Sequence, residues 1–190
     1  MEDHIKEMEQ LSHKMFYEDL TLGLESRKRF LQILVEISQS NNHELIQKAA
    51  DQFPVNSSYN EPFFSEAEAT AFSTILTRVK KHIEKLLLFN CGLYTQQFSS
   101  ISSAIMGMNE TIGEFCVCHN ELDSSDVDTM CQILPKINKK LCIVKCFAGK
   151  KGSRNANQEE RLKLQQALQQ LRNKELMIQL DDCGSELKKN

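Results

Sequence analysis

The chain has 190 residues, of which 41% are hydrophobic and 26% are charged, and it contains only seven glycines and three prolines. This composition excludes collagen-like, low-complexity and wholly disordered classes, and the length favours one domain with a sizeable core. The formal net charge of −3 excludes a global attraction to nucleic acid or to anionic membranes. Any such binding would require a local cluster of charge.

The first fifty residues have the apolar spacing of amphipathic helices. Apolar side chains recur every three or four positions from Ile5 to Met15, which predicts a first helix that ends before or near Gly23. A densely apolar second helix is expected over 26–39, ahead of the Ser-Asn-Asn turn. A shorter third helix is predicted over 43–53.

The segment 53–64 contains two prolines, several Asn and Ser residues and no apolar period, so it is predicted to be a loop. Ser65 is followed three residues later by Glu68, immediately before a periodic apolar run. This is the spacing of a capping box, in which the two side chains bond the free amide groups of a first helical turn. A major helix is therefore predicted to begin at Ser65.

Two apolar series follow this predicted cap, each with spacings that alternate between four and three. No formal charge occurs from Leu86 to Asn109, which is typical of a helix surrounded by other elements. We therefore predict helix from Ser65 to His119, either continuous or broken at Gly92. The two series are Phe72, Leu76, Val79, Ile83, Leu86 and then Tyr94, Phe98, Ile101, Ile105, Met108, Ile112, Phe115, His119.

A third series from Val127 to Val144 predicts a further helix, bent at Pro135. The expected fold is all-α, an elongated helical bundle with long, coiled-coil-like helices. The bundle is expected to occupy 1–148, followed by a flexible linker at 149–157, an amphipathic C-terminal helix at 158–182 and a tail at 183–190.

The seven cysteines are odd in number, and the N-terminus has neither the charged nor the apolar region of a signal peptide. Reduced thiols are expected, in a cytoplasmic or nuclear protein that is not secreted. The charge-free stretch is too polar for confident insertion, so no transmembrane segment is predicted.

Cys116, Cys118 and His119 are weak candidates for metal binding, because thiolate and imidazole are the natural ligands of zinc. On the helix expected here, the first two side chains would point about 200° apart. Structural thiols are therefore favoured, and no metal or other cofactor is expected.

No pattern of an enzyme is found. The chain lacks the Gly-x-Gly-x-x-Gly, Gly-x4-Gly-Lys-Ser/Thr and Gly-x-Ser-x-Gly patterns, and no Glu is followed three residues later by His. The chain is therefore predicted to be non-enzymatic, with no catalytic residues.

A local basic segment is the clearest charge pattern. No acid occurs between Asp128 and Glu159, and the lysines alternate with apolar residues rather than with stacking aromatics. Sequence-specific nucleic-acid binding is therefore not expected, whereas an acidic protein or an anionic lipid surface would fit. The segment comprises Lys136, Lys139, Lys140, Lys145, Lys150, Lys151 and Arg154.

The favoured function is protein–protein interaction through amphipathic helices, as an adaptor or a subunit of a larger complex. The alternative is a peripheral lipid-binding bundle that acts through the basic segment. The partner is a protein, which could be a second copy of the chain. The expected docking seam is on the C-terminal helix, where packing within the chain is the competing interpretation: Leu164, Leu168, Leu171 and Ile178.

Overall fold

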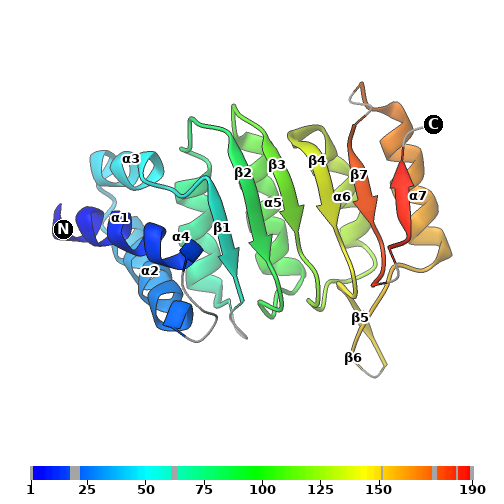
Figure 1. Ribbon diagram of the computed structural model, residues 1–190, viewed down its shortest axis with the longest axis horizontal. Helices are drawn as coiled ribbons and strands as arrows, with labels where there is room; N and C mark the ends of the chain where they lie inside the picture. The colour runs from blue at the N-terminus through cyan, green and yellow to red at the C-terminus, as the bar shows by residue number, and fades with distance from the viewer. Residues whose placement is uncertain are drawn as a thin grey trace.

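The computed structural model describes residues 2–17, 22–60, 64–150, 152–172, 175–182 and 184–188. Helices and strands alternate along most of the chain, and six of the strands form one mixed sheet (Figure 1). The elements are α1 (Glu2–Tyr17), α2 (Leu22–Gln39), α3 (His43–Asp51), β1 (Asn56–Tyr59), α4 (Glu66–Leu76), β2 (Ile83–Leu88), α5 (Thr95–Gly107), β3 (Ile112–Cys116), α6 (Asp126–Ile133), a 3-10 turn (Leu134–Lys136), β4 (Ile137–Cys142), β5 (Phe147–Gly149), β6 (Gly152–Arg154), α7 (Gln158–Gln170), β7 (Met177–Gln179) and β8 (Glu186–Lys188).

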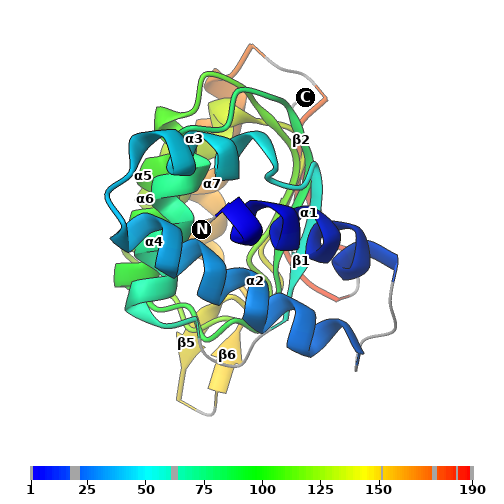
Figure 2. The same ribbon diagram turned by 90° about the vertical axis from the view of Figure 1, so that its left-hand side faces the viewer.

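The sheet has the strand order β1-β2-β3-β4-β7-β8, so neighbours in space are also neighbours in the chain apart from the β5–β6 hairpin. The first five strands are parallel, and β8 pairs antiparallel with β7. Each parallel connection passes through a helix, and α4, α5, α6 and α7 all lie on the same face of the sheet (Figures 1 and 2). Among the described residues, no helix covers the other face along most of its width (Figures 1 and 2).

The repeating unit has a nearly constant length at the N-terminal side of the sheet. Ser57 pairs with Leu86, and Leu86 pairs with Phe115, so that 29 residues separate each of these register partners. From Phe115 to Leu141 the separation is 26 residues, with a register shift before Glu114. The strand side chains that point toward the helices are buried and form the core between the sheet and the helices.

The three N-terminal helices pack at the β1 end of the molecule, against one another and against β1 and α4 (Figure 2). An aromatic cluster fills this end, with Phe72 at its centre. Its ring centroid lies 5.4 Å from those of Phe53 and Tyr59 and 5.6 Å from that of Phe64, all edge to face. Edge-to-face pairs of this kind contribute more than their buried area alone.

The all-α prediction is wrong, and so is the prediction of a helical bundle with coiled-coil-like helices. Each predicted long helix is a true helix followed by a turn and a strand. The series from Phe72 to Leu86 joins α4 to β2, the series from Tyr94 to His119 joins α5 to β3, and the series from Val127 to Val144 joins α6 to β4. Buried residues in a strand lie two positions apart, or three where the strand bends. By coincidence, these spacings continued the alternation of four and three residues in the preceding helix.

Several predicted boundaries are confirmed. The capping box at the start of α4 is present, with the Ser65 N–H donating to Glu68 Oε2 at 2.7 Å and the Glu68 N–H donating to Ser65 Oγ at 3.2 Å. The third predicted helix corresponds to α3, and the C-terminal helix begins at Gln158 as expected. These starts are confirmed because a cap depends on residues close in sequence.

The other predicted divisions differ from the structure. The predicted loop 53–64 contains β1, and its residues 61–63 lie outside the described residues. The predicted linker 149–157 contains the turn and second strand of the β5–β6 hairpin. The C-terminal helix ends at Gln170 rather than near 182, β7 follows it, and part of the predicted tail forms β8.

No helix in the described part of the chain combines the length and the hydropathy that crossing a bilayer would require.

Candidate functional site

The face of the sheet opposite α4–α7 presents two rows of side chains across the strands. Residues two apart in a strand point to the same face, and register partners in parallel strands lie side by side. The side chains in these rows are half-buried or exposed. One row is Asn56, Lys85, Glu114, Lys140, Met177 and Lys188, and the other is Ser58, Leu87, Cys116, Cys142, Gln179 and Glu186.

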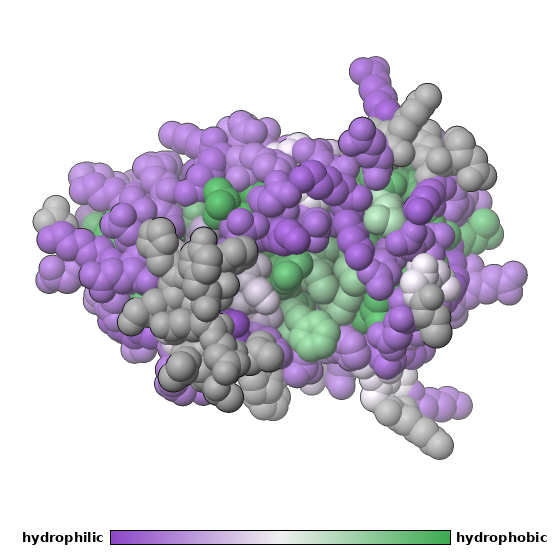
Figure 3. Space-filling view, in the orientation of Figure 1, coloured by the Kyte–Doolittle hydropathy of each residue, from purple (hydrophilic) through white to green (hydrophobic). Residues whose placement is uncertain are grey.

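We call this surface the open sheet face. In Figure 3, which has the orientation of Figure 1, apolar residues gather near the centre of this face, with hydrophilic residues above and below them. A shallow cavity of about 150 Å³ lies at the centre, lined by Leu87, Glu114, Phe115, Cys116, Lys140 and Cys142. In the first row, Lys85 Nζ lies 3.4 Å from Glu114 Oε1. Lys140 lies beside Glu114 in register, and no ion pair to it is found among the described residues.

Three thiols meet on this face. Cys118 Sγ lies 3.0 Å from Cys142 Sγ, and the sulfurs of Cys116, Cys118 and Cys142 all lie within 4.8 Å of one another. Cys118 is 4% exposed, and the other two are half-buried. Hydrogen bonds from the thiols of Cys116 and Cys118 hold the pKa of Cys142 well below its usual range, and nearby Lys140 lowers it further. Hydrogen bonding to the other two sulfurs, together with burial, raises the pKa of Cys118.

The sequence analysis named two of these three thiols but separated them in space. Cys116 ends β3 and Cys118 begins the turn that follows it, where the two sulfurs lie close together instead of diverging as they would on a helix. Cys142 joins them because β4 pairs in parallel with β3. His119 does not join the cluster; its ring packs against that of Phe89, with a centroid distance of 4.8 Å.

Asn120 ties adjacent turns of the repeat together beneath this face. The fully buried side chain donates through Nδ2 to the carbonyls of Leu88 and Val117, both at 2.8 Å. Its Oδ1 accepts from the N–H groups of Cys91 and Leu93, both at 3.0 Å. These bonds hold the chain that leaves β2 against the chain that leaves β3.

The equivalent position in the preceding turn is Cys91, whose Sγ donates to the Tyr59 carbonyl at 3.3 Å. The same separation of 32 residues joins Cys91 to Tyr59 and Asn120 to Leu88. The buried residues of the two turns are Ile83, Leu86, Leu88, Cys91, Leu93 and then Ile112, Phe115, Val117, Asn120, Leu122.

The two turns share the spacing L-x-x-L-x-L-x-x-N/C-x-L, with Ile, Phe and Val in some of the Leu positions, and this resembles the spacing of leucine-rich repeats. The signal was present in the sequence. The sequence prediction assigned each strand to the end of the preceding helix, and this division of the chain hid the repeat. Recognition of the repeat would have predicted both the parallel sheet and its open face.

The predicted docking seam lies inside the molecule. Leu164 and Leu168 on α7 and Ile178 on β7 are fully buried, and Leu171 is half-buried against the same core. The structure thus shows packing within the chain, which was the competing interpretation of this helix. A single exposed apolar side chain on α7, Leu162, is 57% exposed on the opposite side of that helix.

Three residues of the predicted basic segment pair with acids in the structure. Lys139 pairs with Glu84 at 2.6 Å, Lys145 pairs with Asp182 at 2.6 Å, and Arg154 forms two hydrogen bonds of 2.7 Å to Glu160. Lys136 donates to the carbonyl of Met108. Lys150 is exposed, and Lys151 lies outside the described residues.

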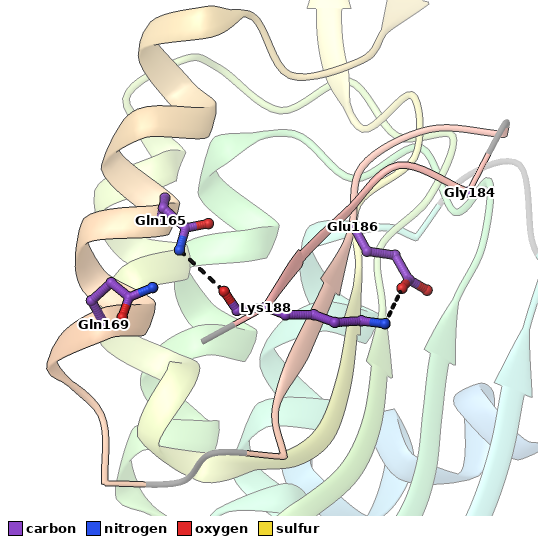
Figure 4. Close-up of a pocket in the computed structure, with 5 residues that line it drawn as sticks. All are labelled: Gln165, Gln169, Gly184, Glu186 and Lys188. Carbon is purple, nitrogen blue, oxygen red and sulfur yellow. Dashed lines mark hydrogen bonds and ion pairs between the residues drawn. The ribbon is translucent and has the colours of Figure 1, made fainter. Parts of the chain in front are cut away.

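An open cavity of about 730 Å³ lies between α7 and β8 and is lined by Gln165, Gln169, Gly184, Glu186 and Lys188 (Figure 4). Gln165 Nε2 donates to the Lys188 carbonyl at 3.2 Å, and Lys188 pairs with Glu186 at 2.9 Å. The side chains that carry charge here are thus already paired with each other. The cavity brings together no nucleophile, base or set of metal ligands, so the open sheet face is the stronger candidate site.

No protein-family model, curated protein or solved structure matches this chain in the comparisons made. The functional interpretation therefore rests on the open sheet face and on the repeat that builds it.

Proposed function

We propose that this chain is a non-enzymatic protein–protein interaction module that binds a polypeptide partner on its open sheet face. The observation that carries the proposal is the placement of α4–α7 on one face of a sheet whose first five strands are parallel (Figures 1 and 2). Parallel sheets are usually covered on both faces. Repeat proteins that leave one face bare use such extended surfaces for binding.

The chemistry of the face supports a protein partner. Its rows place apolar Leu87 and Met177 among charged and amide side chains, and apolar residues gather near the centre of the face (Figure 3). An apolar area within polar surroundings is typical of protein interfaces, and here the Lys85–Glu114 pair and Lys140 add charge beside it. Three residues of the basic segment, Lys139, Lys145 and Arg154, pair with acids, which leaves less free positive charge for the lipid-binding alternative.

The size of the face indicates which residues would contribute. Six strands at ~4.8 Å spacing and ~3.3 Å per residue give a surface of roughly 500 Å², whereas a standard interface buries about 800 Å² on each partner. The loops that follow the strands would supply the remainder. Phe89, which follows β2 and is 38% exposed, lies next to Leu87 and is the largest apolar side chain available there.

Site-specific photo-crosslinking tests the proposal. A benzophenone amino acid replaces either Phe89 beside the open face or Leu162 on α7, and the full-length chain is irradiated in cells. We expect discrete crosslinked polypeptides from position 89 only, and their loss when Lys140→Glu is added without a change in melting temperature. Equal yields from both positions, or none from position 89, would contradict the proposal. A product of twice the chain mass would identify the partner as a second copy.

A further inference from the structure

The three thiols on the open sheet face differ in position from the cysteines of the core. Cys91 and Cys146 occupy the inward position of the repeat and are fully buried. Cys116, Cys118 and Cys142 lie on the opposite face, two of them half-buried beside a solvent-open cavity. Packing in the apolar core therefore accounts for Cys91 and Cys146 but not for the three thiols on the open sheet face.

The sulfur positions are compatible with one shared cation. An ion bound ~2.3 Å from each of three sulfurs requires sulfur–sulfur distances of roughly 3.7–4.0 Å. The closest pair, Cys118 and Cys142, is 3.0 Å apart, and no pair exceeds 4.8 Å. A shared ion would therefore require Cys118 Sγ and Cys142 Sγ to separate by roughly 0.7–1.0 Å. The backbone is fixed by parallel pairing of β3 with β4.

The surroundings also suit a thiolate site. Lys140 lines the same cavity as Cys116 and Cys142, so its positive charge would offset the net negative charge of three thiolates around a divalent ion. Gln179 is the register partner of Cys142, and its Oε1 lies 3.6 Å from Cys142 Sγ. The cavity of about 150 Å³ beside the sulfurs leaves room for a fourth ligand from solvent.

We propose that Cys116, Cys118 and Cys142 bind one zinc ion on the open sheet face, with the fourth coordination position facing solvent. Binding releases the thiol protons and forms three sulfur–zinc bonds, with no change of oxidation state. The site does not depend on a protein partner, so it can be tested on the isolated full-length chain. Failure of the crosslinking experiment above would leave it unaffected.

Zinc binding is measured on the purified chain after chelation and reduction with a phosphine under anaerobic conditions. Equilibrium dialysis with elemental analysis gives the stoichiometry, and competition with a chromophoric chelator gives the affinity. We expect one zinc per chain. Cys116→Ser and Cys142→Ser should each weaken binding by more than the ~10–100-fold that loss of an outer-shell partner costs. Cobalt(II) should show sulfur-to-metal charge-transfer absorption that decreases in both variants.

Cys131→Ser is the matched control. Cys131 is also half-buried, but it lies on α6 outside the thiol cluster, so its loss should leave stoichiometry and affinity unchanged. Melting temperatures of the metal-free variants verify that each one folds. Zinc should also protect the three thiols of the unsubstituted chain from alkylation, which mass spectrometry detects without any variant.

Four results would overturn the proposal. The first is absence of stoichiometric zinc at tens of micromolar, and the second is an equal loss of binding in Cys131→Ser. The third is a Cys118–Cys142 disulfide in protein alkylated at the moment of cell lysis, which would define the pair as a redox couple instead. Binding of copper(I) with exclusion of zinc would likewise contradict the assignment.

Discussion

Replacement of Asn120 by Leu should destabilise the protein severely although the two side chains have nearly the same shape. Asn120 makes five hydrogen bonds from a fully buried position, two as acceptor and three as donor. Leucine retains the branched shape and removes all five bonds. The loss in free energy of unfolding of this variant therefore reports the lost hydrogen bonds, with little contribution from a cavity.

The size of the expected stability loss follows from the buried polar groups that lose their hydrogen-bond partner. The N–H groups of Cys91 and Leu93 each have a single proton, which points at Asn120 Oδ1 in the folded chain. The Cys118 carbonyl still accepts from the Asn90 N–H at 2.9 Å and is therefore not stranded. At about 1–3 kcal/mol for each stranded buried group, the two N–H groups alone give a loss of roughly 2–6 kcal/mol. A typical domain has a total stability of about 5–15 kcal/mol.

Asn120→Cys provides a graded control, because cysteine occupies the equivalent position at Cys91. There its sulfur donates to the carbonyls of Tyr59 and Phe89. Cysteine at position 120 should likewise retain contacts to the corresponding carbonyls while leaving the two N–H groups without a strong acceptor. Its free energy of unfolding should lie between those of the unsubstituted chain and Asn120→Leu.

Urea unfolding followed by far-UV circular dichroism measures these differences, provided that the slope with denaturant is unchanged. Hydrogen exchange should in addition show faster exchange at the Cys91 and Leu93 amides than elsewhere in the sheet. A loss below ~0.5 kcal/mol in Asn120→Leu, within the range of ordinary surface substitutions, would refute the assigned role. So would a leucine variant that is as stable as the cysteine variant.

Three further substitutions test the fold, each by urea unfolding. Burial alone would raise the pKa of Glu160, but hydrogen bonds from the Arg154 guanidinium and the Asn157 N–H lower the pKa overall from 4.5. The stability that ionised Glu160 contributes is therefore present at neutral pH and is lost as the pH falls below about 4.5. Glu160→Gln should therefore cost roughly 1–3 kcal/mol at pH 7, and the difference from the unsubstituted chain should disappear in acid. Gly113→Ala should destabilise by about 1–3 kcal/mol, because a Cβ there would lie 2.5 Å from the Glu84 backbone oxygen. Leu168→Ala should cost about 2–5 kcal/mol while exposed Leu162→Ala changes stability by less than ~0.5 kcal/mol, and equal effects would contradict the packing of α7 described above.

The thiol cluster shows how one wrong secondary-structure assignment propagates to a site. Cys116 and Cys118 are two residues apart, a spacing that separates side chains on a helix and aligns them on a strand. Assignment of this segment to a helix therefore disfavoured a site that the strand makes geometrically possible. The third thiol, Cys142, lies 24 residues beyond Cys118 in the chain, and local spacing offers no way to pair it with the others.

The sequence by itself determined the features that depend on near neighbours. The capping box at Ser65, the extent of α3 and the start of α7 were predicted, because their hydrogen bonds join residues three or four apart. Only the tertiary structure decided that the segments after α4, α5 and α6 are strands. Their register partners on neighbouring strands lie 25–37 residues away in the chain, and a short apolar run becomes a strand when such a partner is present.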